Sequence, residues 1–398
     1  MNLKFEMEDE GTASAARIKV IGVGGGGSNA VAHMMASGLE GVEFHVMNTD
    51  IQALRASPVP NKLAIGCKIT QGRGAGADPE IGKQAALEDT ERISEILQGA
   101  DLVFVTAGLG SGTGTGAAPV ISGFANKMNA LTVAIVTMPF AFEGERRIRQ
   151  AEAGLAELTG NADTVITIQN ERLLALAPRG TSILEAFKMG HDFLRRTVQD
   201  LVEIVTTPGF INRDFSDVRS TLVGMGYAVL GTATARGDNA VIEAARQAIS
   251  CPLIDQTGIR GARNVLLNVT GSTRLGLHEV NDACQMIRQA TGRNDVQVNF
   301  GLAFNEAMAD SVKVTLIATG FPGPGQMPEM AEEQAASQSG WLSEAEAEAP
   351  APAPAPVAAP EPVEVETKPP NGTPALPPVE EMDDLDKPAY LRQRRVVH

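Results

Sequence analysis

The sequence has few aromatic residues, few cysteines and no long apolar run. Only 4% of the 398 residues are aromatic, so small aliphatic side chains and 41 glycines must form the core and the turns. Three scattered cysteines, Cys67, Cys251 and Cys284, argue against a disulfide framework and indicate free thiols in a reducing compartment. No run reaches the roughly 18 apolar residues of a membrane span, and residues 1–16 carry acids where a secretory signal is basic. We therefore expect a soluble, cytoplasmic protein without direct membrane insertion.

An excess of basic charge is also missing. The net charge is −15, with 48 acidic and 33 basic residues. This balance argues against nucleic acid as a partner, because phosphate backbones require clustered lysine and arginine. The five histidines share no metal-ligand spacing and no C-x-x-C pattern occurs, so we predict no metal site built from protein ligands. An anionic ligand must then be held by a local feature.

The residues from 17 to about 178 alternate short apolar runs with helical patterns. The apolar runs are 18–23, 44–47, 102–105, 133–136 and 165–168. Continuous apolar strands separated by helices are typical of a parallel sheet that is covered on both faces, and ligands bind outside the carboxyl ends of such strands. Residues 182 to about 206 then place apolar side chains at helical spacing without proline, which predicts one long helix.

A second, smaller α/β unit is predicted after this helix. Its apolar segments are 218–233, 264–269, 296–300 and 311–318, and its helices are 238–248 and 277–290. The fold class is therefore α/β, with an N-terminal Rossmann-like parallel sheet, a long central helix and a C-terminal α/β domain. The predicted boundaries are 1–16 for a disordered extension, 17–181 for the first domain, 182–207 for the central helix and 208–319 for the second domain.

The composition changes after residue 320. Residues 321–398 hold 15 of the 23 prolines, and 14 acidic against 5 basic side chains. Such a segment cannot bury enough apolar surface to fold alone, so 320–381 is predicted to be a disordered linker. Residues 382–398 restore Leu385, Tyr390 and Leu391 among charges. This pattern predicts a docking peptide on a tether, although an exposed terminus also tolerates such residues.

Three glycine-rich segments indicate a phosphate site. Residues 108–116 join a predicted strand to a predicted helix, residues 22–27 do the same after the first strand, and 72–78 form a third segment. Glycine allows positive φ and close backbone approach, and the N–H groups and dipole of a helix N-terminus favour an anion. Three such loops at successive strand ends suit a ligand that carries several phosphate charges.

Residues 22–27 also support an alternative. Gly22, Gly24 and Gly27 fit G-x-G-x-x-G, and Asp50 lies near the position of a ribose-binding acid. A nicotinamide-dependent oxidoreductase is therefore an alternative, although its fingerprint needs only one glycine-rich loop. A Walker P-loop is absent because Gln84 follows Lys83, and the guanine-reading motif of Ras-like GTPases is absent as well.

The order Gly-Ser-Gly-Thr-Gly-Thr-Gly that ends at Gly116 closely resembles the signature loop of the tubulin and FtsZ family of GTPases, and its FtsZ branch most closely. The resemblance runs from about residue 17 to 319 and returns near the C-terminus. It implies a cytoskeletal GTPase that binds GTP or GDP, with Mg²⁺ bound mainly through phosphates and water. It also implies head-to-tail self-assembly in the mid-cell ring of dividing bacteria, and docking of membrane adaptors and division regulators to 382–398.

The resemblance also implies roles for individual residues. It implies nucleotide-loop contacts at Gly24, Gly25, Ser28, Asn29, Gly74, Ala75, Gly110, Gly112, Thr113, Gly114 and Thr115. It implies that Glu143 and Arg147 hold the ribose, and that Asn170, Phe187 and Asp192 read or stack on guanine. A carboxylate suits guanine because the base offers paired N1–H and N2–H donors. By pattern alone, Phe187 is more typical of a core residue of the long helix.

Asn212, Asp214 and Asp217 follow the long helix and are the predicted catalytic residues. Carboxylates near the carbonyl end of a helix dipole can orient and polarise a water molecule for attack on phosphate. By pattern alone, a helix-capping cluster is more typical. Residues 209–219 resemble the family's synergy loop, which implies that they complete the active site of a neighbouring subunit. A tubulin-like scaffold that does not hydrolyse GTP remains an alternative.

Two positions depart from the family pattern. Ser111 replaces the usual glycine of the signature loop, and Met138 stands where the FtsZ branch often has lysine. Neither change touches the predicted chemistry directly.

Overall fold

The computed structural model describes residues 16–178, 180–206, 215–251 and 258–321. All of these residues belong to one compact unit, Met1–Pro328. The predicted N-terminal extension, except Ala16, and the predicted linker and docking peptide, except Gly320 and Phe321, lie outside the described residues. Asn212 and Asp214 lie outside them as well.

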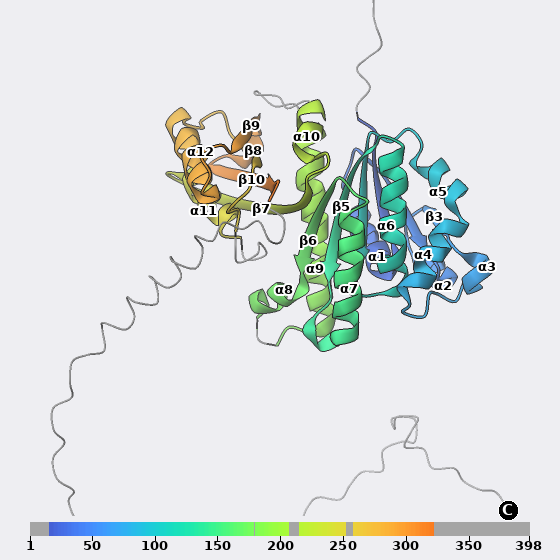
Figure 1. Cartoon of the computed structure of the whole chain (residues 1–398). Coiled ribbons are helices and arrows are strands. Elements are labelled where there is room, and N and C mark those ends of the chain that lie inside the picture. Colours follow the sequence, from blue (N-terminus) through green and yellow to red (C-terminus); the bar gives the residue numbers. More distant parts are fainter. Residues whose placement is uncertain (1–15, 179, 207–214, 252–257, 322–398) are drawn as a thin grey trace, which may run out of the picture. The chain divides into compact units, whose positions relative to one another are not determined.

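A ten-stranded sheet runs through the described residues in the order β3-β2-β1-β4-β5-β6-β7-β10-β8-β9 (Figure 1). Its first six strands are β1 (Ile18–Val23), β2 (Val42–Asn48), β3 (Asn61–Ala64), β4 (Leu102–Gly108), β5 (Leu131–Met138) and β6 (Thr164–Gln169). All neighbours among these six are parallel, which confirms the predicted parallel sheet. The sequence analysis missed β3, a four-residue strand that pairs with β2 and begins with the exposed Asn61 and Lys62.

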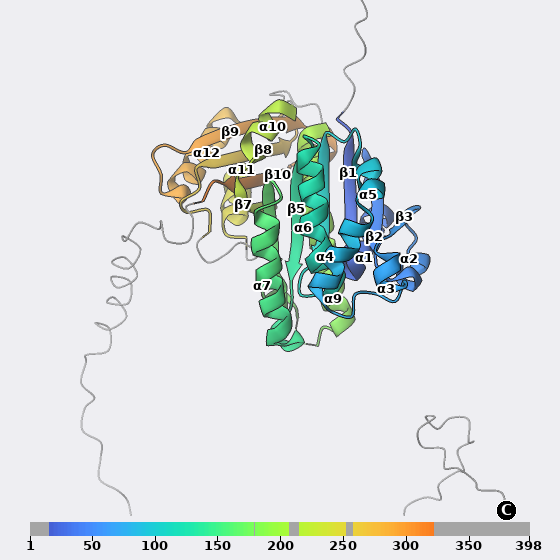
Figure 2. The ribbon, with the colours of Figure 1, turned by 45° about the vertical axis from the view of Figure 1, so that its right-hand side comes forward.

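Helices cover both faces of this parallel sheet. They are α1 (Gly24–Ala36), α2 (Ile51–Ala56), α3 (Cys67–Thr70), α4 (Pro79–Glu88), α5 (Thr90–Leu97), α6 (Gly112–Lys127), α7 (Glu145–Thr159), α8 (Asn170–Leu176), α9 (Ile183–Thr206) and α10 (Phe215–Leu222). Because strand side chains alternate between faces, Val20 and Phe104 pack with residues of α1 and α9, whereas Ile21 and Val105 pack with residues of α6. Figure 2 shows α6 and α7 in front of the sheet.

Helix α9 confirms the predicted long helix, but its two halves differ. Leu194, Val198 and Leu201 are buried in the core beneath the sheet. In the first turn, by contrast, Ile183 and Leu184 are 68% and 65% exposed. The apolar side chains of α9 therefore belong to the core only in the second half of the helix. Those in its first turn are free of the core and can contact something else.

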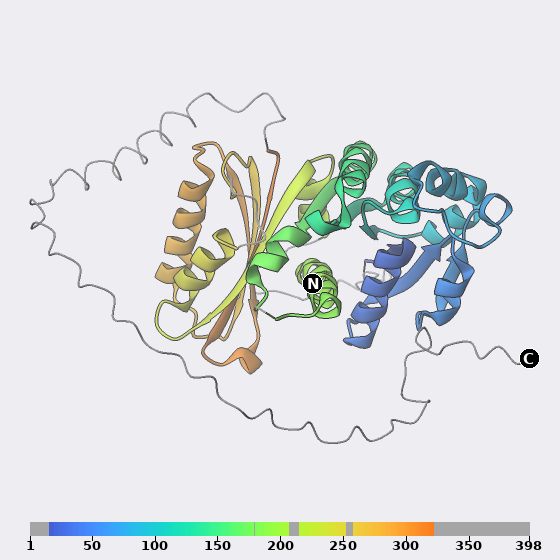
Figure 3. The ribbon, with the colours of Figure 1, turned by 90° about the horizontal axis from the view of Figure 1, so that it is seen from below.

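The C-terminal part is an α/β unit, as predicted. Its elements are β7 (Gly226–Arg236), α11 (Ala240–Ile249), β8 (Asn264–Gly271), α12 (Leu277–Thr291), β9 (Gln297–Phe304) and β10 (Ser311–Thr319). Strand β10 runs antiparallel to both β7 and β8. Helices α11 and α12, yellow and orange in Figure 3, lie on one side of these strands.

The sequence analysis treated 218–233 as one apolar segment, but the structure divides it between two elements. Its first residues complete α10, which ends at Leu222, and β7 begins only at Gly226. Gly224, between the two elements, and Gly226, the first residue of β7, both have a positive φ of 66°, a conformation that ends the helix and redirects the chain.

Two of the three glycine-rich segments, 22–27 and 108–116, contain the start of a helix rather than forming separate loops. Helix α1 starts at Gly24 and α6 at Gly112. The missing side chains allow close packing: a Cβ atom on Gly24 would lie 2.8 Å from the backbone nitrogen of Gly114, and one on Gly116 would lie 1.8 Å from the carbonyl oxygen of Pro79 in α4. Glycine is a poor helix former, so this packing overrides its propensity.

We predict that Gly116→Ala lowers the free energy of unfolding by about 1 to 3 kcal/mol, because α4 and α6 must move apart to admit the methyl group. Gly160→Ala is the matched control, since a Cβ atom there would lie 3.5 Å from its nearest neighbour, the carbonyl oxygen of Glu157. Urea denaturation of both variants measures the difference. Equal stability of the two variants would contradict the packing role.

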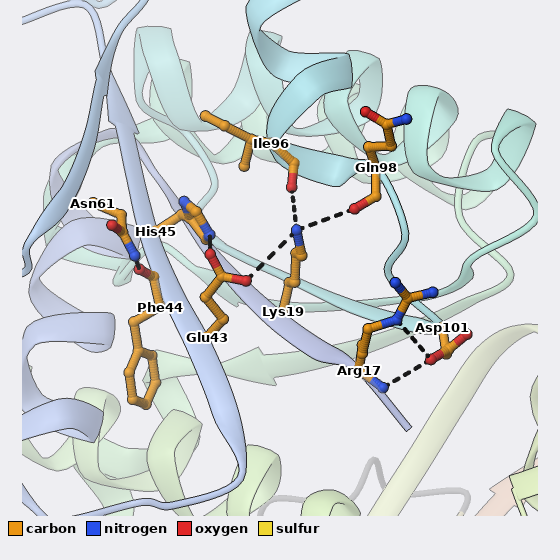
Figure 4. A network of polar contacts seen from close by, with 9 residues as sticks. All are labelled: Arg17, Lys19, Glu43, Phe44, His45, Asn61, Ile96, Gln98 and Asp101. Carbon is orange, nitrogen blue, oxygen red and sulfur yellow. Dashed lines mark hydrogen bonds and ion pairs between the residues drawn. The ribbon is translucent and has the colours of Figure 1, made fainter. Parts of the chain in front are cut away.

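A polar network joins the first two strands to the end of α5 (Figure 4). The Lys19 ammonium donates to the carbonyl oxygens of Ile96 and Gln98 at 2.6 and 3.3 Å, so it neutralises the C-terminal end of the α5 dipole. Its Nζ also lies 3.6 Å from the Glu43 carboxylate, which hydrogen-bonds His45 at 2.8 Å. This network holds the end of α5 against β1 and β2.

His45 makes part of the stability dependent on pH. Burial lowers the pKa of His45 from its ordinary value of 6.5, and the Glu43 carboxylate opposes this shift only in part. As pH falls below about 6.5, the unfolded chain therefore takes up the proton before the native chain does, and stability is lost.

We predict that His45→Gln reduces this loss of stability, since glutamine does not titrate. Urea denaturation of both proteins at a series of pH values from neutral to mildly acid measures it. Parallel stability curves for the two proteins would contradict the assignment.

Candidate functional site

An open pocket of ≈ 400 Å³ lies at the carboxyl ends of the parallel strands. It is lined by Gly26, Asn29, Gly108, Leu109, Ser111, Thr137, Pro139, Glu143, Arg147, Asn170, Leu184, Phe187, Gly190 and His191. These residues lie at the carboxyl ends of β4 and β5, in the segments that follow β1, β4, β5 and β6, or in α9. The strand order reverses between β1 and β4, and open α/β sheets bind their ligands at this point.

Two helix N-termini meet beside the pocket. Strands β1 and β4 are adjacent and parallel, with Val23 opposite Ala107, so α1 and α6 begin at the same edge of the sheet. Among the described residues, neither helix has a side-chain cap or an acid in its first turn. In contrast, Asp50 and Asp78 accept hydrogen bonds from the first turns of α2 and α4. The uncapped N–H groups and the two dipoles together favour an anion.

The other predicted loops join this arrangement. The hydroxyl groups of Thr49 and Thr113 lie 2.7 Å apart in a buried hydrogen bond, and Gly74 donates its N–H to the Thr49 carbonyl at 3.2 Å. Residues 72–78 therefore reach the end of β2 although they follow α3, which corrects the expectation that this loop leaves a strand. Ala75 lies against α6, since a Cβ atom built on Gly112 would be 2.9 Å from the Cβ atom of Ala75.

Thr115 lies on the opposite side of α6 from this meeting point. Its side chain lines a second, smaller pocket of ≈ 140 Å³ with Lys83 and Glu157, and its methyl group would lie 2.4 Å from a Cβ atom on Gly154 in α7. Its hydroxyl has no hydrogen-bond partner among the described atoms. If a ligand binds at the first turn of α6, Thr115 would therefore contact it only through backbone atoms.

The predicted residues of the first loop lie in and beside α1. Asn29 lines the pocket, and Gly24 packs against Gly114. Gly25 is exposed, and a Cβ atom there would have no described atom within 4 Å. Ser28 is 5% exposed and its buried hydroxyl oxygen lacks a partner in the part of the chain that the structure describes. Space and an unused polar group are thus both present at this helix start.

Glu143 and Arg147 form an ion pair in the wall of the pocket. The Glu143 carboxylate accepts from the N–H of Phe140 at 3.0 Å and from the Arg147 guanidinium. The backbone oxygen of Arg147 lies 2.8 Å from where a Cβ atom on Gly110 would be, so this glycine admits the start of α7. A carboxylate and a guanidinium held together in this way can bind hydroxyl groups of a ligand from two sides.

Asn170 and Phe187 both line the pocket. Asn170 is 6% exposed, and its Oδ1 finds no partner among the described atoms. A buried acceptor without a donor costs about 1 to 3 kcal/mol, which a ligand that donates a hydrogen bond would recover. The Phe187 ring is 36% exposed and stands edge-on to Phe140 at 5.3 Å, so the core role suggested by pattern alone is wrong.

Asp192 is not among the described residues that line the pocket. Its carboxylate accepts from Arg195 at 3.0 Å and pairs with Arg196 at 2.8 Å, and His33 lies at 3.6 Å. Burial raises the pKa of Asp192, but the hydrogen bond from Arg195 and the charge of Arg196 outweigh it and hold the pKa below its usual value. The residue that lines the pocket is His191, which the sequence analysis missed although it lies four residues after Phe187.

Asp217 lies in the first turn of α10, not at the end of the long helix. The expectation of a carboxylate near the carbonyl end of a dipole is therefore corrected for this residue, because the start of a helix favours negative charge. Its carbonyl oxygen accepts from the hydroxyls of Ser220 and Thr221 at 2.8 and 2.9 Å. Arg219 donates to the carbonyl oxygen of Asn129 at 3.0 Å.

The two departures from the family pattern have local explanations. The Ser111 hydroxyl donates to the carbonyl oxygen of Gly108 at 2.9 Å and so closes the turn between β4 and α6. Met138 is partly buried and packs on the core between the sheet and α6. Within the described ranges no cluster of three or more potential metal-binding side chains occurs, and no helix there is long and apolar enough to span a bilayer.

Comparison with known proteins identifies the family. Residues 17–178 match the model of the tubulin/FtsZ family GTPase domain, and residues 226–322 match that of the FtsZ family C-terminal domain. The chain is 37% identical to an FtsZ from M. jannaschii solved as an empty dimer; the match covers 77% of this chain and 88% of that one, with a TM-score of 0.69. A point mutant of FtsZ from M. jannaschii is also 37% identical, with coverages of 77% and 92% and a TM-score of 0.71.

A more distant structure shares the fold. CetZ2 from Haloferax volcanii, solved as a protofilament with GTPγS bound, is 24% identical, with coverages of 83% and 99% and a TM-score of 0.67. The identity and coverage of the FtsZ structures decide between the two interpretations of the glycine-rich segments, in favour of a GTPase rather than an NAD-dependent oxidoreductase. The chain belongs to the tubulin/FtsZ family of self-assembling cytoskeletal GTPases, and within that family to the FtsZ group.

Proposed function

We propose that the pocket holds a guanine nucleotide whose phosphates bind at the N-termini of α1 and α6. The observation that carries this proposal is the meeting of two uncapped helix N-termini beside a pocket that also contains the Glu143–Arg147 pair. The ribose would bind to this pair, and the base would lie against Phe187 and the unpaired Oδ1 of Asn170. Gly110, Gly112, Thr113, Gly114 and Thr115 would contribute backbone contacts to the phosphates, with Gly74 and Ala75 beside them.

Mg²⁺ fits this site only if it binds together with the phosphates of the nucleotide. Among the described lining residues the only carboxylate is Glu143, and it is already paired with Arg147. A divalent ion would therefore be bound by phosphate oxygens and water, which is common for magnesium. When bound, it would neutralise part of the charge on the triphosphate.

We further propose that GTP is hydrolysed where one subunit meets the next. An FtsZ relative forms a dimer and a CetZ relative forms a protofilament, which supports head-to-tail self-association of this chain. Asp217 would then act on the nucleotide of a neighbouring copy, together with Asn212 and Asp214, which lie outside the described residues. In this arrangement a single copy binds GTP but hydrolyses it slowly.

The cellular role follows as a prediction from membership of the FtsZ group. We propose that the filaments act in the cytoplasm, in a mid-cell division ring of bacteria. Residues 382–398 would bind membrane adaptors and division regulators, with 320–381 as the tether. The boundaries 17–181, 182–207 and 208–319 remain our proposal for the GTP-binding domain, the central helix and the C-terminal domain.

We predict that Gly25→Ala weakens GTP binding by about tenfold or more without a change in stability, because the added methyl group projects into space reserved for phosphate. No described atom lies within 4 Å of that position, so the fold itself tolerates the change. Isothermal titration with GTP and a urea denaturation curve measure the two effects. Gly160→Ala, which adds a methyl group far from the pocket, serves as control; unchanged GTP affinity in Gly25→Ala would refute the phosphate position.

We predict that GTP turnover per molecule rises steeply with protein concentration, because the active site is complete only between two copies. Asp217→Ala should keep the affinity for GTP and lose most of its turnover, since its carboxylate would act on water rather than on binding. Phosphate release from nanomolar to tens of micromolar protein, with and without Mg²⁺, tests both expectations. A specific rate that stays flat over this range, or an equal loss of affinity and turnover in Asp217→Ala, would exclude the shared site.

A further inference from the structure

We propose that Asn299 and Thr221 are positioning residues for the hydrolysis of GTP, because they hold the first turn of α10 in place and with it the carboxylate of Asp217. This inference rests on the proposed role of Asp217 at the nucleotide of a neighbouring copy. It gives the C-terminal α/β unit a part in the reaction, although none of the described residues that line the pocket comes from its strands.

Two hydrogen bonds in series connect strand β9 to the first turn of α10. The side-chain amide of Asn299 donates to the hydroxyl oxygen of Thr221 at 2.8 Å, and this hydroxyl donates to the carbonyl oxygen of Asp217 at 2.9 Å. A threonine hydroxyl has one proton, so with that proton on Asp217 its lone pairs accept from Asn299. Thr221 is 2% exposed, and its hydroxyl is therefore largely shielded from water.

The alternation of side chains along β9 explains why Asn299 faces α10. Val298 and Phe300 pack on the core shared with α11 and α12, so Asn299 between them points to the opposite face of the sheet. Its partner in β8 is Leu266, which is buried in the same core as Leu222 of α10. Helix α10 lies on this face beside β8 and β9 (Figure 2).

Apolar packing alone would not fix the direction of Asp217. Val218 and Leu222 bury one side of α10 in the core, but apolar contacts are non-directional and tolerate a small rotation of the helix. The end of a side chain lies about 5 to 6 Å from the helix axis, so a rotation of about 10° moves it by about 1 Å. A displacement of this size can lower a reaction rate by roughly a hundredfold. The directional hydrogen bonds of Thr221 oppose such a rotation.

The last turn of α10 is held from both parts of the fold. The Thr164 hydroxyl of β6 donates to the carbonyl oxygen of Leu222 at 2.5 Å, and the Thr319 hydroxyl of β10 donates to that of Thr221 at 3.2 Å. The last carbonyl groups of a helix have no partner within it, so these two bonds anchor the end of α10 to β6 and β10. The bonds of Asn299 and Thr221 extend this anchoring back to the turn that carries Asp217.

GTP turnover of full-length variants tests the proposal. We expect Asn299→Ala and Thr221→Val to lower turnover per molecule by about five- to fiftyfold, while the dissociation constant for GTP changes by less than about twofold. Thr221→Ser, which keeps the hydroxyl, should retain most of the turnover. Phosphate release at saturating GTP and titration calorimetry measure the two quantities. Asn299→Ala and Thr221→Val interrupt the same pair of bonds, so either variant decides if the other does not fold.

Asn268→Ala is the matched control. Asn268 lies on β8 and on the same face of the sheet as Asn299, since its partner in β9 is Gly301, two residues further along the strand. Its side-chain amide also donates to a threonine, Thr270, but at 3.4 Å and within β8. This variant loses a similar bond without loss of a contact to α10, so its turnover should stay close to that of the unmodified protein.

A coupling experiment separates positioning from a general loss of structure. Because Asn299 is proposed to act only through Asp217, its removal should cost nothing further in a protein that already lacks this carboxylate. The double variant Asn299→Ala, Asp217→Ala should therefore release phosphate at the same residual rate as Asp217→Ala. Urea denaturation shows that each variant is folded, and sedimentation with GTPγS shows that it assembles.

The outcomes separate this inference from the proposed function. If Asp217→Ala retains the turnover of the unmodified protein, the proposed function fails. If Asp217→Ala loses turnover but folded Asn299→Ala and Thr221→Val keep it, the proposed function stands and the positioning role is overturned. A further loss of turnover in the double variant, or a loss of assembly that matches the loss of turnover in the single variants, would also overturn it.

Discussion

The close approach of two helix N-termini is the constraint on which the pocket depends. Strands β1 and β4 are neighbours, so α1 and α6 leave the sheet side by side, and a Cβ atom on Gly24 would lie 2.8 Å from the Gly114 nitrogen. Gly24 and Gly114 are thus required by backbone packing alone. Gly25 has free space around it, so its lack of a side chain has no packing reason. One glycine-rich motif therefore contains positions of two physical kinds, those that bring the helices together and those that leave room for a ligand.

The parallel sheet and the long helix could be predicted because continuous apolar strands and helical spacing reflect burial directly. Strand β3 could not, because an edge strand that begins with exposed Asn61 and Lys62 has no apolar pattern to reveal it. The segment 218–233 contains the end of α10 and most of β7, and the left-handed conformation of Gly224 and Gly226 marks the change from helix to strand. The starts of α1 and α6 were predicted too late in the chain, since glycine's low helix propensity is overridden by packing that only the tertiary structure reveals.

The site could be predicted in composition but not in orientation. Asn29, Glu143, Arg147, Asn170 and Phe187 come from widely separated parts of the chain and gather in one pocket, as the family resemblance implied. Periodicity alone would not have united them, since they lie on four different segments. A resemblance also compares residue types, and a carboxylate is the expected partner of guanine. A resemblance of residue types does not show the rotation of a helix, and side chains one residue apart on a helix point in directions that differ by about 100°.

The direction of Asp192 is explained by what lies further along α9. Arg195, which holds Asp192, also donates to Gln199 at 2.5 Å, and Gln199 donates to Glu203 at 2.7 Å. Glu203 in turn accepts from Lys313 of β10 at 2.8 Å. Each side chain in this row contacts a neighbour about one helical turn away, and Asp192 takes part at its first position. Asp192 is thus the first member of a row of polar contacts that attaches α9 to the C-terminal strands.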